Sequence, residues 1–303
     1  DQYNIYISTD EFSIKGTQFN GAQIYAFSKS ELVALSHSVH YVHFGNLRSG
    51  GAKALSVQPA ISYGNPEAEY FLNSIDPNGT GDNRLGVWAM TDRQEVSAGG
   101  VPNLSSVVIT SERYGVPPPA IQKGSNRTLD SGDDRMQQVE YINGNIWGEL
   151  DTIVRISGDR TPRAGAAWFE VHPRLSGEQI GGASIMNQHY IAVKGEYLLY
   201  PAIAVSPANT AAIIMTLSGA DFYPSVVYAV KQVDQNSFGT LHIAAFGTGP
   251  YRAGTRWGDY SWAVFDPGTD GFWLATEYVP PLSSQTPDRK TNWGTRVLEV
   301  STG

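Results

Sequence analysis

Apolar and polar residues alternate in short runs along the whole chain, and this period of two predicts many short β-strands. One series of runs has an aromatic or apolar residue near its centre. Its copies lie about 60 to 80 residues apart, the spacing of a unit of four strands with some long loops. The series comprises 22–27, 85–90, 166–171, 225–230 and 294–300.

A second series precedes the first in each unit, and tight turns lead into four of its five members. These turns are rich in residues that accept a positive φ or pre-set the backbone, as hairpin turns require. The members are 3–8, 69–74, 146–151, 211–217 and 272–277, and the turns are 64–67, 143–145, 206–209 and 266–271. The strands that enter these turns are 58–62, 138–141, 200–205 and 259–264.

Apolar runs come before those entering strands, and we expect them to be innermost and buried on both faces. They are 39–44, 106–110, 189–193 and 241–246. Radial repetition of four-stranded sheets is the architecture of a β-propeller. We therefore predict an all-β fold, a β-propeller of five four-stranded blades, in a single domain over residues 1–303. A sandwich or a β-helix would not show this strand order.

The first unit is expected to be incomplete. The chain opens on a strand of the second series, so the two inner strands of blade one should lie upstream of Asp1. The first blade then has an open edge, which is a surface for self-association.

Composition agrees with this class of fold. The 303 residues include 32 glycines, no cysteine and 41% hydrophobic residues, enough for a core without disulfides. A net charge of −8 with interspersed signs argues against nucleic acid as a partner. No apolar run is long enough to span a membrane. The sequence opens without a charged-then-apolar segment, so we expect that any signal peptide has been removed or never existed. Low charge, many Tyr, Trp, Asn and Gly residues and no thiols suggest an extracellular protein. Glycosylation sequons occur at Asn78, Asn103 and Asn126.

Hairpin geometry brings charged residues of the last unit together. With the turn centred near Gly268 and Thr269, Asp259 lies opposite about Tyr278. Arg256, Asp259 and Glu277 should then converge at one end of the blade. Long connections at 111–135, 246–257 and 279–292 belong to the same face, and long loops on a rigid scaffold often carry binding residues.

Equivalent positions in other units add carboxylates. In the third unit, Asp133, Asp134 and Arg135 should fold toward Glu149 and Asp151. In the first, Asp10 and Glu11 end a strand at the position of Glu277. Paired carboxylates are what glycoside hydrolysis needs, so the candidate catalytic residues are Asp10, Glu11, Asp151, Asp259 and Glu277. The alternative is structural: Arg256 and Asp259 form a bracing ion pair, and Glu11 and Glu277 are solvated strand-end charges.

Candidate binding residues are Arg256, Arg135 and Trp257, with Trp262 and Trp273 as further rings that could stack on sugars. The competing interpretation is that most of these tryptophans belong to the core. Arg256 would steer an anionic ligand or lower the pKa of a neighbouring carboxyl.

Oxygen ligands alternate in the segment 76–82, and Asp76, Asn78 and Asp82 are candidate Ca²⁺ ligands. The segment lacks the terminal glutamate of an EF-hand, so a plain Asn-Gly turn is the competing interpretation. His37, His40 and His43 alternate between faces of a strand and do not suggest a metal site. No phosphate loop, dinucleotide fingerprint or nucleophile elbow is present, and no other cofactor is expected.

Several segments resemble secreted, mostly uncharacterised microbial β-propeller proteins. The segments with this resemblance are Arg256-Trp-Gly-Asp-Tyr-Ser261, Thr276-Glu-Tyr278, Asn292-Trp-Gly-Thr-Arg296, Tyr6-Ile-Ser-Thr-Asp-Glu-Phe12, Gly21-Ala-Gln-Ile-Tyr-Ala-Phe27, Leu199–Val205 and Phe222–Ser225. The resemblance spans most of the chain and implies a missing strand upstream. It implies no activity.

Two functions remain open. The first is an extracellular module that binds glycan, matrix or protein, or assembles through its open edge. The alternative is a carbohydrate-active enzyme. An enzyme requires at least two carboxylates in one concave pocket, whereas a binding module requires exposed aromatic and polar groups around a shallow site.

Overall fold

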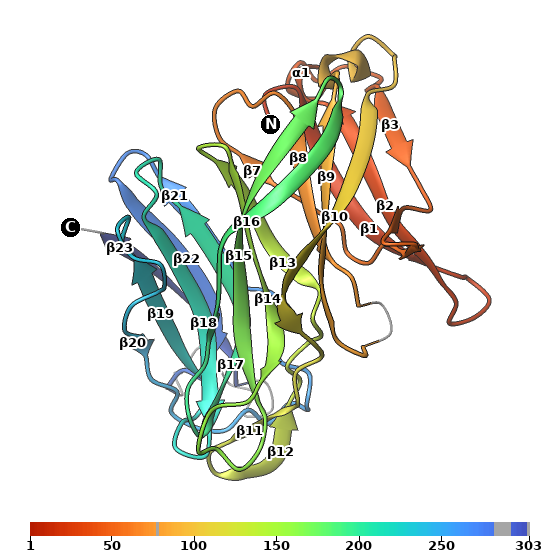
Figure 1. Ribbon diagram of the computed structural model, residues 1–303. Coiled ribbons are helices and arrows are strands. Elements are labelled where there is room, and N and C mark those ends of the chain that lie inside the picture. The colour runs from red at the N-terminus through yellow and green to blue at the C-terminus, as the bar shows by residue number, and fades with distance from the viewer. Residues whose placement is uncertain (77–78, 282–291, 302–303) are drawn as a thin grey trace. The chain divides into compact units, whose positions relative to one another are not determined.

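A computed structural model describes residues 1–76, 79–281 and 292–301 of the chain (Figure 1). Strands make up 56% of it and helices 3%, which confirms the all-β class. Most strands pair with the strand before or after them in the chain, and no sheet of the described residues closes on itself. No helix in the described ranges is long and apolar enough to cross a membrane.

Contacts divide the chain into two compact units. Unit 1 holds residues 1–113, 139–148 and 169–187, and unit 2 holds 114–138, 149–168 and 188–303. The single domain expected over 1–303 stays a prediction.

Unit 1 contains two meanders. The first has the order β1-β2-β3, and the second has the order β10-β9-β8-β6. A small hairpin, β4-β5, lies between them in the chain, and the short helices α1 and η1 connect β2 to β3 and β9 to β10. The bounds are β1 Asn4–Phe12, β2 Phe19–Ser28, α1 Lys29–Val33, β3 Tyr41–Phe44, β4 Arg48–Ser49, β5 Ala52–Lys53, β6 Gln58–Pro59, β8 Glu69–Ser74, β9 Asp82–Thr91, η1 Arg93–Val96 and β10 Asn103–Tyr114.

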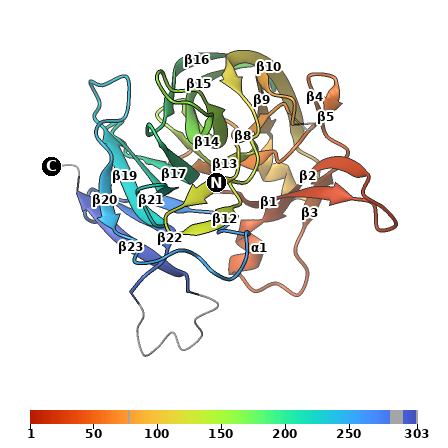
Figure 2. The same cartoon turned by 90° about the horizontal axis from the view of Figure 1, so that it is seen from below.

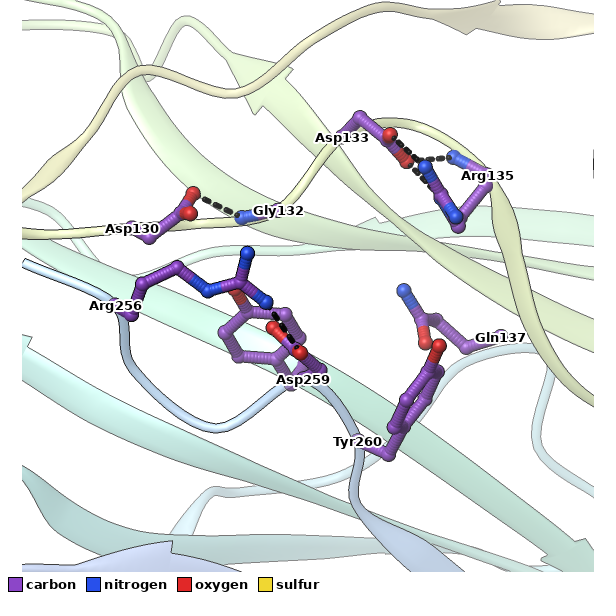
Figure 3. A pocket seen from close by; sticks show the side chains of 9 residues that line it. Asp130, Gly132, Asp133, Arg135, Gln137, Arg256, Asp259 and Tyr260 are labelled. Atoms are coloured by element: carbon purple, nitrogen blue, oxygen red, sulfur yellow. Dashed lines mark hydrogen bonds and ion pairs between the residues drawn. The ribbon is translucent and has the colours of Figure 1, made fainter. Parts of the chain in front are cut away.

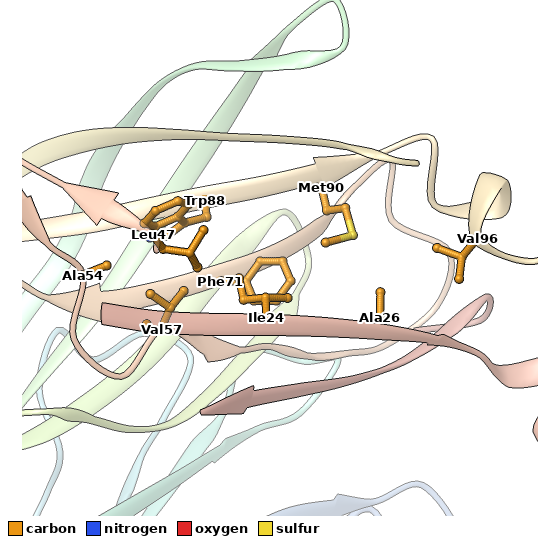
Figure 4. Packing of buried hydrophobic residues seen from close by; sticks show 10 residues of the cluster. Ile24, Ala26, Leu47, Ala54, Val57, Phe71, Trp88, Met90 and Val96 are labelled. Carbon is orange, nitrogen blue, oxygen red and sulfur yellow. The ribbon is translucent and has the colours of Figure 1, made fainter. Parts of the chain in front are cut away.

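The core of unit 1 lies between its two meanders (Figure 4). Ile24 and Ala26 of β2 face Phe71 of β8 and Trp88 and Met90 of β9, all at most 4% exposed. Ile24 and Ala26 lie on the same face of β2, because successive side chains of a strand point to opposite sides of its sheet. Burial of these apolar side chains supplies most of the favourable free energy of packing.

A five-stranded sheet has the order β16-β15-β14-β13-β7, and β13 to β16 each carry residues of both units. The Asn143-Gly144 turn between β13 and β14 has φ values of +51° and +83°, the conformation expected of a two-residue hairpin loop. The short β7 pairs with β13 in parallel, unlike the other strands. The bounds are β7 Ile61–Ser62, β13 Met136–Ile142, β14 Asn145–Val154, β15 Arg163–Ser176 and β16 Gln179–Ile191.

Unit 2 adds the meanders β17-β18-β19-β20 and β21-β22-β23 and the hairpin β11-β12. Figure 2 shows β17 and β21 adjacent, and the Ser261 hydroxyl next to β21 donates to the Tyr200 carbonyl of β17 at 2.5 Å. The bounds are β11 Ala120–Gln122, β12 Ser125–Leu129, β17 Glu196–Val205, β18 Ala211–Gly219, β19 Ser225–Lys231, β20 His242–Ala245, β21 Trp262–Asp266, β22 Gly271–Tyr278 and β23 Gly294–Ser301.

The predicted strands exist, but the predicted boundary between one four-stranded unit and the next was wrong by one strand. The apolar runs expected to be innermost form β3, β10, β16 and β20, and each pairs with the strand before it at the end of a sheet. Their side chains are partly exposed, whereas every residue of β17 is buried. Consecutive antiparallel strands pair most readily with each other, so an apolar run closes one meander instead of opening the next. The same shift makes β1 an end strand of its sheet, not the third strand of a blade.

Candidate functional site

Unit 2 contains a polar cavity of about 390 Å³ (Figure 3). Its walls come from the segment between β12 and β13 together with Gln137 of β13, from the loop before β21, and from Tyr200 of β17. This volume falls in the usual range of small-molecule sites. The lining residues are Asp130, Gly132, Asp133, Arg135, Gln137, Tyr200, Arg256, Asp259 and Tyr260.

One wall is braced by local hydrogen bonds. The Asp130 carboxylate accepts the Gly132 N–H at 3.1 Å, a short side-chain turn typical of aspartate. On the same wall, the guanidinium of Arg135 donates two hydrogen bonds to the Asp133 carboxylate, at 2.7 and 2.6 Å. A bidentate pair of this kind fixes the direction of both side chains. The wall therefore presents its charges in a defined geometry.

The opposite wall carries a second pair of the same chemistry. Arg256 donates to Asp259 at 2.5 Å, and this carboxylate raises the pKa of the guanidinium. The backbone N–H of Asp130 donates to the Thr255 carbonyl at 2.7 Å, which joins the two walls. Both members of the Arg256–Asp259 pair are exposed to solvent, so the pair contributes little to stability.

Tyr200 lines the cavity from a β-bulge. The pairing of β17 with β18 shifts between Leu199 and Ala202, and Tyr200 has φ +50°, which is rare for a residue with a large side chain. Side chains satisfy both backbone groups: Asp151 accepts the N–H at 2.8 Å, and Ser261 donates to the carbonyl at 2.5 Å. Strained bulges often re-aim a side chain at a functional site.

Two buried polar atoms at this bulge have no hydrogen-bond partner among the described residues. They are the Tyr200 hydroxyl and Oδ2 of Asp151, in side chains of residues 4% and 0% exposed. Burial raises the pKa of both groups, and Asp130 raises each further. Burial therefore favours the protonated form of both side chains. Unpaired buried polar atoms are rare in proteins and call for an explanation.

The structure brings three predicted site residues, Arg256, Asp259 and Arg135, into this cavity. Asp151 supports the cavity from behind Tyr200 and does not line it. Glu277 lies beside the loop before β21: burial raises its pKa, the Gly258 N–H bonds its carboxylate and counters this, and Asp259 raises the pKa further. The predicted hairpin register is confirmed, since β21 pairs Trp262 with Ala275.

Asp10 and Glu11 lie on β1 in unit 1 and have local partners. Ser56 donates its N–H and its hydroxyl to Asp10 at 2.9 and 2.5 Å. Glu11 accepts Gln23 at 2.7 Å and Asn20 at 3.3 Å. These bonds tie both carboxylates to neighbouring residues of unit 1, and their catalytic role stays a prediction.

The expectation that Trp257 is an exposed stacking ring was wrong. The residue is 2% exposed, and its ring packs edge-on against Tyr251 at 5.1 Å in a core cluster of unit 2. The sequence Trp-Gly before a strand does not reveal which way the ring turns. Trp262 and Trp273 are exposed by 52% and 41%, and neither lines the cavity.

The candidate calcium segment is closed by its own backbone. Asp76 accepts the N–H groups of Thr80 and Gly81 at 2.8 and 2.6 Å, and Asp82 forms an ion pair with Arg84 at 2.6 Å. Asn78 lies outside the described residues. Within those residues, no group of three or more His, Cys, Asp or Glu side chains could hold a metal.

Sequence reasoning missed Asp130, Gln137, Tyr200 and Tyr260. One signal was available for Tyr200: proline follows it inside a strand, and a strand proline marks an edge or a bulge. Asp130 stands before a Ser-Gly pair, which marks a turn, but no local pattern places that turn opposite Arg256.

Comparison with protein families finds no match to this chain, and comparison with curated proteins finds none either.

Proposed function

We propose that the chain is an extracellular binding module that takes a glycan at the cavity of unit 2. The observation that carries this proposal is the lining itself: carboxylate, guanidinium, amide and phenol groups converge on one concave surface. Neighbouring hydroxyls of a sugar match planar groups that accept or donate two hydrogen bonds. Tyr260, which is 65% exposed, offers a ring to the apolar face of a sugar.

A five-bladed propeller is the architecture we propose for the scaffold. In its support, the five larger sheets follow each other along the chain as meanders, as consecutive blades do. A crystal structure in which these sheets do not surround a common axis would contradict this proposal.

A glycosidase is the second candidate, because Asp130, Asp133 and Asp259 share one cavity. Two of these three carboxylates are already engaged in ion pairs with Arg135 and Arg256. Asp151, whose pKa burial raises, is fully buried and lies outside the lining. The arrangement therefore favours binding over hydrolysis.

The experiment is a titration of the full chain against soluble polysaccharides, neutral, amino-bearing, uronic and sulfated, by isothermal calorimetry. Tyr260→Ala and Gln137→Ala should each weaken binding to the preferred polysaccharide about 10-fold or more. The matched control is Tyr41→Ala, a tyrosine 59% exposed on β3 of unit 1. No binding to any of the four classes, or equal losses in Tyr41→Ala, would argue against a glycan site here.

The same polysaccharides test the enzyme. Release of new reducing ends that stops in Asp259→Asn, with the fold intact, would favour hydrolysis. Binding without release favours the module.

A further inference from the structure

We propose that the cavity selects a protonated amine, so that its glycan ligand carries an amino sugar whose ammonium sits between Asp130 and the Tyr200 hydroxyl. This inference rests on the proposed glycan site and names the chemical class that the site prefers.

The charges that line the cavity favour a cationic ligand. The cavity holds three carboxylates and two guanidiniums, and Asp133 and Asp259 are paired with Arg135 and Arg256. Asp130 forms no ion pair with any described residue, and its carboxylate accepts the Gly132 N–H. The surplus charge of the site is therefore negative and is located on Asp130. A cation compensates this charge, whereas an acidic sugar would add to it.

The Tyr200 hydroxyl also indicates a ligand, independently of the charges. Tyr200 lines the cavity and is only 4% exposed. Its hydroxyl has no hydrogen-bond partner among the described residues. An ammonium has three donors, enough to reach a carboxylate and a phenol oxygen together. The bulge, held by Asp151 and Ser261, fixes this oxygen in place before the ligand arrives.

The arginines argue against the opposite choice. Arg135 donates two bonds to Asp133, and Arg256 is bound to Asp259, so each guanidinium already has an anion. An acidic sugar would have to displace a carboxylate before it could bind. Steering of an anionic ligand by Arg256, which the sequence had suggested, is for this reason not the role we assign.

The test uses three β-1,4-linked hexasaccharides that differ at one position of each ring: glucosamine, N-acetylglucosamine and glucose. Calorimetric titration of the full chain at slightly acidic pH should give about 10- to 100-fold tighter binding of the glucosamine oligomer. This preference should shrink as salt is raised, since screening weakens a charge pair at an open site.

Two variants locate the effect. Asp130→Asn keeps an oxygen for the Gly132 N–H and removes the charge, so it should abolish the preference for the amine, while the exposed control Asp234→Asn leaves it intact. Tyr200→Phe removes a hydroxyl without a partner, so it should weaken amine binding and leave the thermal midpoint unchanged or raised. A purely structural role would instead lower the midpoint.

The outcomes separate the two proposals. Equal binding of all three oligomers, or a preference that survives in Asp130→Asn, overturns the amine selectivity and leaves the glycan site standing. Binding of none of these oligomers, nor of the polysaccharides above, overturns the glycan site itself.

Discussion

The backbone N–H of Tyr200 donates to Oδ1 of Asp151 at 2.8 Å, and this bond joins strands β17 and β14 across 49 positions of the chain. Tyr200 stands in a bulge, where no neighbouring strand can accept its N–H. The buried carboxyl of Asp151 accepts it instead, and the tyrosine is thereby held at the cavity wall.

Substitution of Asp151 tests that relationship. Asp151→Ala leaves a buried N–H without an acceptor and should lower the free energy of unfolding by about 1–3 kcal/mol. Asp151→Asn keeps an acceptor oxygen for this N–H and is uncharged, the form that burial favours, so it should cost about 1 kcal/mol or less. Urea denaturation at pH 7 measures both. Equal losses in the two variants would show that Asp151 supports the bulge through its volume and not through the hydrogen bond.

Glu69 should make stability depend on pH. Burial raises its pKa from 4.5 to about 7, although the Asp1 ammonium, Ser62 and Arg93 counter part of the shift. Because the folded pKa is the higher one, the stabilising contribution is complete below pH 4.5 and is lost as the pH rises through about 7. The free energy of unfolding should therefore fall by about 3 kcal/mol from this group toward alkaline pH.

Glu69→Gln is the control for this slope. The variant cannot ionise, so its urea midpoint should vary less between pH 5 and 8 than that of the native chain. Asp151 and Glu277, whose pKa values are also raised, add slopes of the same sign in both proteins. Parallel curves for the two proteins would refute the assignment to Glu69.

Gly132 should be intolerant of a side chain. It has φ +69°, and a Cβ there would stand 3.1 Å from Cε1 of Tyr200. Gly132→Ala should lose about 1–3 kcal/mol of stability through backbone strain and also move the tyrosine ring. Gly177, with φ +61° and open space around it, is a matched position. Gly177→Ala should show the strain alone and leave ligand binding unchanged, and a loss of binding in both variants would contradict this account.

Trp257 should matter for stability through its burial. Trp257→Ala removes a ring packed against Tyr251 and should cost about 3–5 kcal/mol. Trp262→Ala removes a half-exposed ring and should cost about 1 kcal/mol or less. Thermal denaturation compares the two directly. A small loss for Trp257→Ala would mean that the site repacks around the missing ring.

The sequence determined the all-β class, the positions of most strands and the register of the last hairpin. These features depend on neighbours in the chain: alternation assigns a face to each residue, and the Asn143-Gly144 turn and the turn before β22 set which residues pair. The Arg256–Asp259 pair was also predictable from the local sequence, because its members are only three positions apart.

Only the tertiary structure decided the site. Asp130 meets Thr255 of a distant loop, Asp151 reaches Tyr200 from another sheet, and Trp257 turns inward. Each of these depends on how one sheet packs against the next, which strand periodicity does not encode. The grouping of strands into blades was wrong for a related reason. An apolar run has the same sequence pattern whether it is buried on both faces or forms the last strand of a meander. Only its pairing with the preceding strand distinguishes the two cases.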